Sequence, residues 1–139
     1  MAMDKLPKRF SEWFASRGWT IHPIQQQMLQ HAQATALLLI APTGGGKTLA
    51  GFLPSLIELS ETSDQGLHTV YISPLKALAA DIKRNLRIPV SEIGLQVRIE
   101  DRTGDTPTSR KRRQRADPPH ILLTTPESLA LLISYEDLT

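Results

Sequence analysis

Apolar residues recur along this chain at two spacings, one typical of helices and one typical of short buried strands. Predicted strands cover residues 36–41, 68–73, 95–100 and 121–124. Predicted helices cover residues 8–17, 23–33, a segment after residue 48, residues 74–88 and a last segment from residue 126. Strands that alternate with helices in this way predict right-handed crossovers and a parallel sheet.

Prolines refine the ends of these elements. Pro54 lies inside the third helical pattern and should bend that helix or cost it a hydrogen bond, and Pro89 should break the fourth. Ser73-Pro74 and Thr125-Pro126 each pair a capping residue with a proline suited to the first helical position. Helices are therefore predicted to begin directly after Ser73 and Thr125.

Four loops with recognisable chemistry each follow a predicted strand. They cover residues 41–48, 73–76, 102–107 and 124–127. Ligands of open parallel sheets bind at the carboxyl ends of the strands. All four loops are therefore predicted to lie at one edge of the sheet, beside a bound nucleotide.

The first of these loops predicts a phosphate-binding site. Its glycines let backbone N–H groups close around phosphate oxygens, Lys47 reaches the β and γ phosphates, and the Thr48 hydroxyl can hold Mg²⁺. The N-terminus of the following helix adds a favourable dipole. The predicted nucleotide contacts here are Ala41, Pro42, Thr43, Gly44, Gly45, Gly46, Lys47 and Thr48. The alternative is a glycine-rich turn beside a solvated lysine.

Composition narrows the classes of protein. The chain has 139 residues, 40% hydrophobic and 22% charged, which suits one soluble domain with a hydrophobic core. The absence of cysteine excludes disulfides and thiolate metal sites. The four histidines have no metal-ligand spacing, and the longest apolar run, residues 34–41, is too short to cross a bilayer. We expect a cytoplasmic protein with no membrane partner.

Charge is unevenly distributed although the net charge is only +2. Residues 110–115 place five cations in six positions. Such a run often follows a phosphate backbone, but a solvated helix face or a loop has the same composition. The sequence leaves these two interpretations open.

Five blocks, in this order along the chain, resemble the motifs of superfamily-2 helicases. Residues 19–25 resemble the Q motif and residues 41–48 motif I, including its initial alanine. Residues 73–78 resemble motif Ia, residues 102–107 motif Ib, and residues 124–129 the block that follows. The amino-acid sequences of residues 6–10 and 66–74 are similar to those of one branch, the large helicase-related family. Within that branch they are similar to the bacterial ligase-associated DEXH-box DNA helicases.

The resemblance implies a fold, a domain plan and an activity. The fold would be α/β, a RecA-like P-loop NTPase domain with a parallel sheet flanked by helices and incomplete at its C-terminus. Residues 1–35 would hold N-terminal helices with the Q-motif segment, and residues 36–139 part of the first motor domain. The activity would be ATP-dependent, Mg²⁺-requiring unwinding or remodelling of DNA, in DNA repair.

The resemblance also implies roles for single residues. Gln25 would read the adenine edge, for which a glutamine amide has the matching donor and acceptor. Lys47 and Thr48 would be catalytic, with Thr48 holding Mg²⁺ through the nucleotide. Three loops would follow a single DNA strand without reading its sequence, through Ser73, Pro74, Leu75, Lys76, Arg102, Thr103, Gly104, Thr125, Pro126 and Glu127. RNA is the alternative strand, and a DNA ligase or nuclease is the implied protein partner.

Aromatic residues near the start of the chain have two interpretations. Phe10, Trp13 or Trp19 is placed to pack on the purine, although a core role is expected for at least two of them. Asp105 is acidic and is expected to hydrogen-bond within its own loop as a turn former.

One expected part of the catalytic machinery does not occur in the sequence. No Asp-Glu-x-His box is present, and Glu136-Asp137 follows no apolar strand that would make it a substitute. We therefore expect the N-terminal piece of a larger helicase, inactive in hydrolysis by itself. Two other classes remain as alternatives: a P-loop phosphotransferase, and a non-catalytic nucleic-acid-binding domain that uses residues 110–115.

Overall fold

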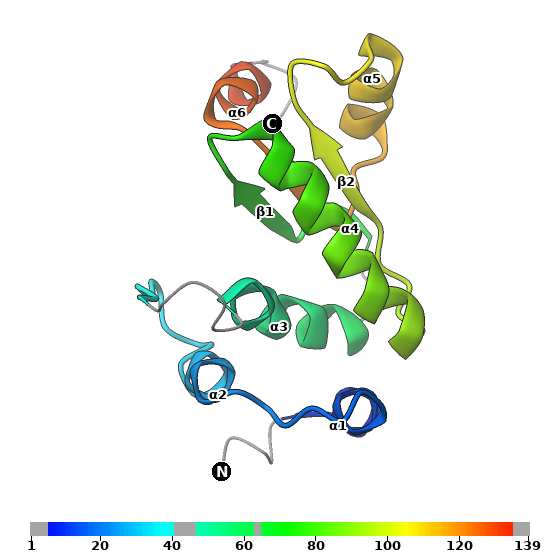
Figure 1. The fold of residues 1–139 in the computed structure, drawn as a ribbon. Helices are drawn as coiled ribbons and strands as arrows, with labels where there is room; N and C mark the ends of the chain where they lie inside the picture. The colour runs from blue at the N-terminus through cyan, green and yellow to red at the C-terminus, as the bar shows by residue number, and fades with distance from the viewer. Residues whose placement is uncertain (1–5, 41–46, 63–64, 135–139) are drawn as a thin grey trace. The chain divides into compact units, whose positions relative to one another are not determined.

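The computed structural model describes residues 6–40, 47–62 and 65–134 (Figure 1). These residues belong to two compact units, each with its own buried apolar residues. The first unit combines residues 1–63 with residues 92–95, and the second combines residues 64–91 with residues 96–139. The predicted boundary between residues 35 and 36 does not coincide with this division, and it stays a prediction about the domain plan.

The first unit is helical. It contains α1 (Lys8–Ser16), α2 (Pro23–Gln30) and α3 (Lys47–Ser60). Apolar side chains of α1 and α3 form its core, and α2 packs against α3. The helix α1 is followed by Gly18, which has a φ of +68° that other residues rarely adopt. The core residues with the least exposure are Phe10, Ala50, Leu53 and Leu56.

The last two residues of α4 (Lys76–Ile93) belong to this unit, together with residues 94 and 95. The Arg9 guanidinium donates hydrogen bonds to the carbonyls of Ile93 and Gly94 at 3.2 and 2.9 Å. Carbonyls at the end of a helix have no N–H donor within the helix. Arg9 supplies these hydrogen bonds, and its positive charge complements the negative end of the helix dipole.

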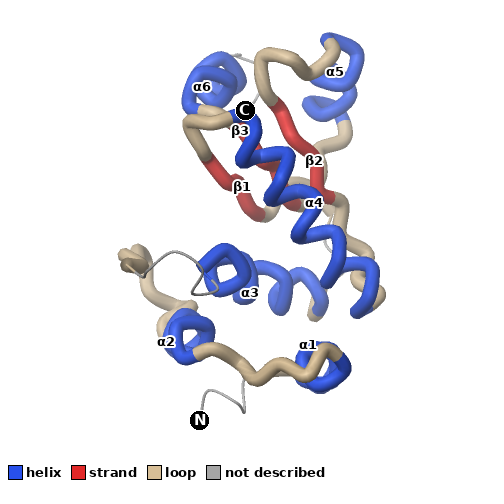
Figure 2. The backbone as a smooth tube through the Cα atoms, viewed as in Figure 1, coloured by secondary structure: helices blue, strands red, loops and turns tan. Residues whose placement is uncertain are grey.

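The second unit is a three-stranded parallel sheet with helices around it (Figure 2). Its strands are β1 (Thr69–Ile72), β2 (Ile99–Arg102) and β3 (Ile121–Thr124), in the order β1-β3-β2. Its helices are most of α4, α5 (Thr108–Ala116) and α6 (Pro126–Ile133). All of β3 is buried, as expected of the central strand of a covered parallel sheet. The predicted α/β class with a parallel sheet is confirmed.

One predicted strand is wrong in its described part. Residues 36–40 form no strand, and Leu38 and Ile40 are 86% and 83% exposed. A strand is stabilised by hydrogen bonds to a neighbouring strand, and none of β1, β2 and β3 pairs with this segment. The apolar composition of residues 36–40 favours a strand, but composition alone does not supply the neighbouring strand that a sheet requires.

Two proline predictions also need correction. The helix α4 continues through Pro89 to Ile93 instead of breaking there. Pro89 and Val90 are buried, so apolar packing offsets the hydrogen bond that proline cannot donate. The same helix begins at Lys76, not directly after Ser73. The third predicted strand is displaced as well, to residues 99–102 instead of 95–100.

The remaining helix predictions are confirmed within a few residues, and α3 accommodates Pro54 in its interior. Within the described ranges, no helix has both the length and the apolar character that a membrane span requires.

Candidate functional site

Three predicted loops lie at the same edge of the sheet. The strands β1, β2 and β3 are parallel and in register, so Ile72, Arg102 and Thr124 end them side by side. The arrows of β1 and β2 point to this common edge in Figure 1. The prediction that the loops after these strands meet at the carboxyl edge is therefore confirmed for residues 73–75, 103–107 and 125.

Hydrogen bonds fix the strand ends from which the loops leave. The Ser73 N–H donates to the Thr124 carbonyl at 3.0 Å, and the Thr124 hydroxyl donates to the Arg102 carbonyl at 2.7 Å. Ser73 and Thr124 are 2% and 0% exposed. Because these groups are buried, the bonds between them are shielded from water and tie the three strand ends together.

The loop after β1 presents three exposed residues. The Ser73 hydroxyl accepts a hydrogen bond from the Leu75 N–H at 3.2 Å, which forms a tight turn before α4. Pro74, Leu75 and Lys76 follow on the surface. Ser73 thus organises the turn before α4, which begins at Lys76 and not at Pro74.

The loop after β2 is organised by two buried threonines. The Thr103 N–H donates to the Thr106 hydroxyl at 2.9 Å, and the Asp105 N–H donates to the Thr103 hydroxyl at 3.2 Å. Gly104 and Asp105 are exposed at its tip. The Asp105 carboxylate lies 3.1 Å from the ammonium of Lys76 at the start of α4. The loops after β1 and β2 are therefore joined by an ion pair.

The loop after β3 is a single residue that caps α6. The Thr125 hydroxyl accepts a hydrogen bond from the Ser128 N–H at 3.3 Å, which confirms the predicted cap. Pro126 and Glu127 lie in the exposed first turn of the helix.

Arg102 has its partners inside the protein. Its side chain is 3% exposed, and its guanidinium donates to the Lys111 carbonyl at 3.1 Å and to the Gln114 amide oxygen at 3.4 Å. Both acceptors belong to α5. The predicted phosphate contact stays a prediction, while the observed contacts tie the end of β2 to α5.

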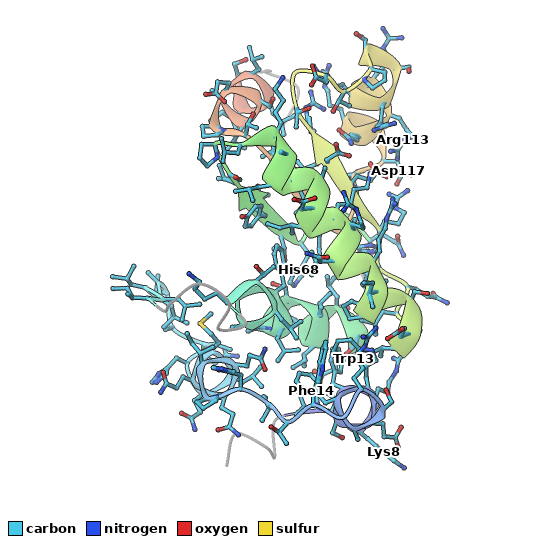
Figure 3. All side chains as sticks on the ribbon, in the orientation of Figure 1. Lys8, Trp13, Phe14, His68, Arg113 and Asp117 are labelled. Carbon is cyan, nitrogen blue, oxygen red and sulfur yellow. The ribbon has the colours of Figure 1, made fainter. Side chains whose placement is uncertain are left out.

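The run of five cations forms α5, and part of its charge is neutralised by β2. Arg113 lies 2.6 Å from a Glu100 oxygen, and Arg110 lies 3.9 Å from Asp101. Arg113 also donates to the Asp117 carbonyl at 3.4 Å, and both residues are labelled in Figure 3. The cluster thus has a structural function on one side of the helix. Whether its exposed side contacts nucleic acid stays a prediction.

Asp101 lies between two of these cations. Its carboxylate is 3.0 Å from Lys83 of α4 in addition to its contact with Arg110. Burial raises the pKa of Asp101, but the hydrogen bond and charge of Lys83, with the charge of Arg110, outweigh burial and lower it. Asp101 is therefore held ionised as the counter-charge of two helices.

The nucleotide-binding residues are described only in part. Residues 41–46 lie outside the described residues, Lys47 begins α3, and Thr48 is exposed in its first turn. Gln25 is 5% exposed, and its side-chain oxygen accepts a hydrogen bond from the His22 N–H at 2.9 Å. This bond fixes the plane of the amide that is predicted to read adenine. The described residues hold no cluster of three acidic or histidine side chains that would bind a metal.

The aromatic residues divide as expected. Phe10 and Trp13 are 1% and 6% exposed and belong to the core, whereas Trp19 is 47% exposed. Trp19 meets Trp13 edge to face at 5.5 Å, and the Arg17 guanidinium lies over both rings. Trp19 is thus the one of the three with surface left to contact a purine.

A hollow that the sequence did not predict lies beside Trp13. It has a volume of about 640 Å³ and is lined by residues of α1, by Arg17 and by the end of α4. Glu92 accepts hydrogen bonds from Trp13 at 2.7 Å and Arg17 at 2.9 Å, which lower the pKa of its carboxyl. Sequence periodicity gave no signal for it, because its two sides are far apart along the chain.

Comparisons with known proteins agree with this geometry. The model of the DEAD/DEAH box helicase family matches residues 22–139. The ATP-dependent helicase Lhr-Core of Methanocaldococcus jannaschii is 39% identical over 93% of this chain and 17% of its own length. The Lhr helicase/probable uracil glycosylase of Mycolicibacterium smegmatis is 40% identical over 88% of this chain and 9% of its own length.

Solved structures show the same likeness. The structure of Mycobacterium smegmatis helicase Lhr bound to ssDNA and AMP-PNP has a TM-score of 0.88 and 36% identity, covering 96% of this chain and 18% of that one. The DUF1998 helicase MrfA has a TM-score of 0.81 and 27% identity, covering 94% of this chain and 20% of that one.

The chain belongs to the DEAD/DEAH box helicase family. Its relatives include the Lhr-type ATP-dependent helicases, which confirms the expected resemblance to the large helicase-related branch. The chain spans less than a fifth of the length of both of these curated relatives.

Proposed function

We propose that this chain is the ATP-binding part, and part of the nucleic-acid track, of an ATP-dependent helicase that moves along single-stranded DNA. The observation that carries the proposal is the meeting of three loops at one edge of the sheet, where buried Ser73, Thr103 and Thr125 are followed by exposed residues. The family match and the relatives named as ATP-dependent helicases support it.

The loops suit a strand that is held without reading its bases. At the exposed positions of these loops, Leu75, Gly104 and Pro126 have no hydrogen-bonding side-chain groups for base edges, and the Asp105 carboxylate is paired with Lys76. Contacts from backbone N–H groups and a lysine to phosphates carry no sequence information, and a motor that steps along any sequence needs such contacts. Arg102 supports this edge from within.

For the nucleotide, the family chemistry fits the residues present. Lys47 at the start of α3 would contact the β and γ phosphates, the Thr48 hydroxyl would hold Mg²⁺, and Gln25 would contact adenine. Bound Mg²⁺ would neutralise the charge of the phosphates. The sequence of residues 1–139 contains no Asp-Glu-x-His box, so water activation is assigned to residues outside it.

The decisive experiment is DNA-stimulated ATP hydrolysis by the complete helicase that carries this chain, with Lys47→Ala. Losing one transition-state charge contact costs on the order of 100-fold in rate, so hydrolysis should fall by at least this factor. Lys8→Ala is the matched control, because Lys8 is exposed on α1 and its ammonium forms a surface ion pair with Glu12. Normal hydrolysis by Lys47→Ala would refute the assignment.

DNA binding, measured beside hydrolysis on the same variant, separates the alternatives. A non-catalytic nucleic-acid-binding domain would bind DNA equally well with Lys47→Ala and would not couple binding to hydrolysis. Stimulation by RNA in place of DNA would assign the track to RNA. A DNA ligase or nuclease partner, implied by family resemblance, should co-purify as ligase or nuclease activity that persists after washing with salt.

A further inference from the structure

The cation available at the three-loop edge is already paired. Among the described residues of the loops after β1, β2 and β3, Lys76 is the exposed cation, since Arg102 is buried. The Lys76 ammonium lies 3.1 Å from the Asp105 carboxylate. The side chains of Lys76 and Asp105 are 57% and 80% exposed, so both are accessible to a ligand.

The loop geometry holds Asp105 in this position. Its N–H donates to the Thr103 hydroxyl, and the Thr106 N–H donates to the Thr103 carbonyl at 3.1 Å. Thr103 and Thr106 are 5% and 7% exposed, so the turn is anchored. The turn uses the backbone of Asp105 and leaves its carboxylate directed at Lys76. The carboxylate is therefore not needed to build the loop.

A carboxylate oxygen and a phosphate oxygen are equivalent acceptors for an ammonium group. A strand whose phosphate binds Lys76 must share this cation with Asp105 or displace Asp105 from it. We propose that Asp105 is an internal competitor for Lys76 that weakens the grip of this edge on the nucleic-acid backbone. The inference rests on the proposed function, because it assumes that this edge carries the strand.

The expected size follows from the exposure of the pair. Exposed ion pairs are weak, so releasing Lys76 by Asp105→Asn should tighten single-strand binding by roughly two- to fivefold. The salt dependence should change too. Each phosphate of a single strand that a free cation neutralises contributes a slope of about 0.7 in log affinity against log salt. When a phosphate displaces Asp105 from Lys76, the freed carboxylate attracts a cation from the salt and so reduces the salt dependence that Lys76 contributes. Asp105→Asn should therefore steepen the slope by up to about 0.7.

The experiment is fluorescence anisotropy of labelled oligothymidylate with the full chain, titrated over a range of NaCl concentrations. Four proteins form a cycle: wild type, Asp105→Asn, Lys76→Ala and the double variant. Glu12→Gln is the matched control, because Glu12 is also an exposed carboxylate paired with a lysine, and it makes the same change in net charge. Circular dichroism of each variant checks that it is folded.

The inference expects tighter binding and a steeper slope with Asp105→Asn, little effect of Glu12→Gln, and a much smaller effect of Asp105→Asn when Lys76 is already alanine. Weaker binding with Asp105→Asn would overturn it and make Asp105 an orienting partner of Lys76. Unchanged binding, or an equal gain from Glu12→Gln, would also overturn it. Absence of salt-dependent binding in the wild type would instead refute the nucleic-acid track itself, and the inference with it.

Discussion

Arg102→Ala is expected to destabilise the second unit without changing how binding depends on salt. The change removes a guanidinium that is 3% exposed at the end of β2. That group donates to the Lys111 carbonyl at 3.1 Å and more weakly to the Gln114 amide at 3.4 Å. Gln114 in turn donates to Glu100 and to the Asp101 carbonyl, both at 3.1 Å. The substitution therefore disturbs the contacts that join α5 to the sheet.

The magnitude follows from these bonds. A hydrogen bond from a charged donor is worth about 1.5–3 kcal/mol, and the longer bond adds little. Loss of the packed alkyl stem adds to this, so Arg102→Ala should lower the free energy of unfolding by about 2–4 kcal/mol. Lys76→Ala should change it by no more than about 0.5 kcal/mol, because Lys76 is exposed and pairs with the exposed Asp105.

Two measurements test this reasoning. Urea denaturation followed by circular dichroism gives the stability, and hydrogen exchange of the β3 amides localises the change to the second unit. Salt titration of single-strand binding, at urea-free conditions where both proteins are folded, gives the slope. If Arg102 were a phosphate ligand, Arg102→Ala would leave stability nearly unchanged and flatten the slope by about 0.7. That pair of results would refute the structural role.

Two further predictions concern charge. Asp101 and Glu92 have pKa values below their ordinary 3.8 and 4.5, so their stabilisation is complete above those values and is lost as the pH falls through the lower folded-state values. Stability to urea should therefore fall below about pH 4.5, and Asp101→Asn should weaken this dependence; equal acid sensitivity with and without Asp101 would contradict it. On α5, Arg113→Ala should cost about 1 kcal/mol through loss of the Glu100 partner, whereas exposed Arg112→Ala should cost almost nothing. Equal losses in urea denaturation would show that the two sides of α5 do not differ.

Much of the second unit was predictable because its signals are local. Residues 121–124 are apolar and flanked by turn residues, and Thr125-Pro126 has the residue types that begin a helix. The edge on which the loops meet follows from the parallel order of the strands and needs no knowledge of side-chain contacts. Sequence was therefore sufficient to locate residues 73–76, 103–107 and 125–127 together.

What failed depended on partners that are distant in sequence. Residues 36–40 have a strand composition, but whether they form a strand depends on a neighbour that local pattern does not supply. Pro89 stays within α4 because packing around it outweighs its local preference. Arg102 resembled a surface cation because its sequence context is polar, while its burial is set by Gln114 and Lys111 on a later helix.

The charges of the site also depend on partners that are distant in sequence. The run of cations in residues 110–115 left a phosphate-binding role and a solvated helix face both open, and Glu100 and Asp101 on the neighbouring strand face two of these cations. At the loop edge, Lys76 similarly faces Asp105. In both places the acids are 9 to 29 residues away from the cations along the chain and meet them only through the sheet topology. The electrostatic field at these positions is therefore smaller than a count of the cations alone would give, which agrees with the proposed motor, since such a motor must release each phosphate as well as bind it.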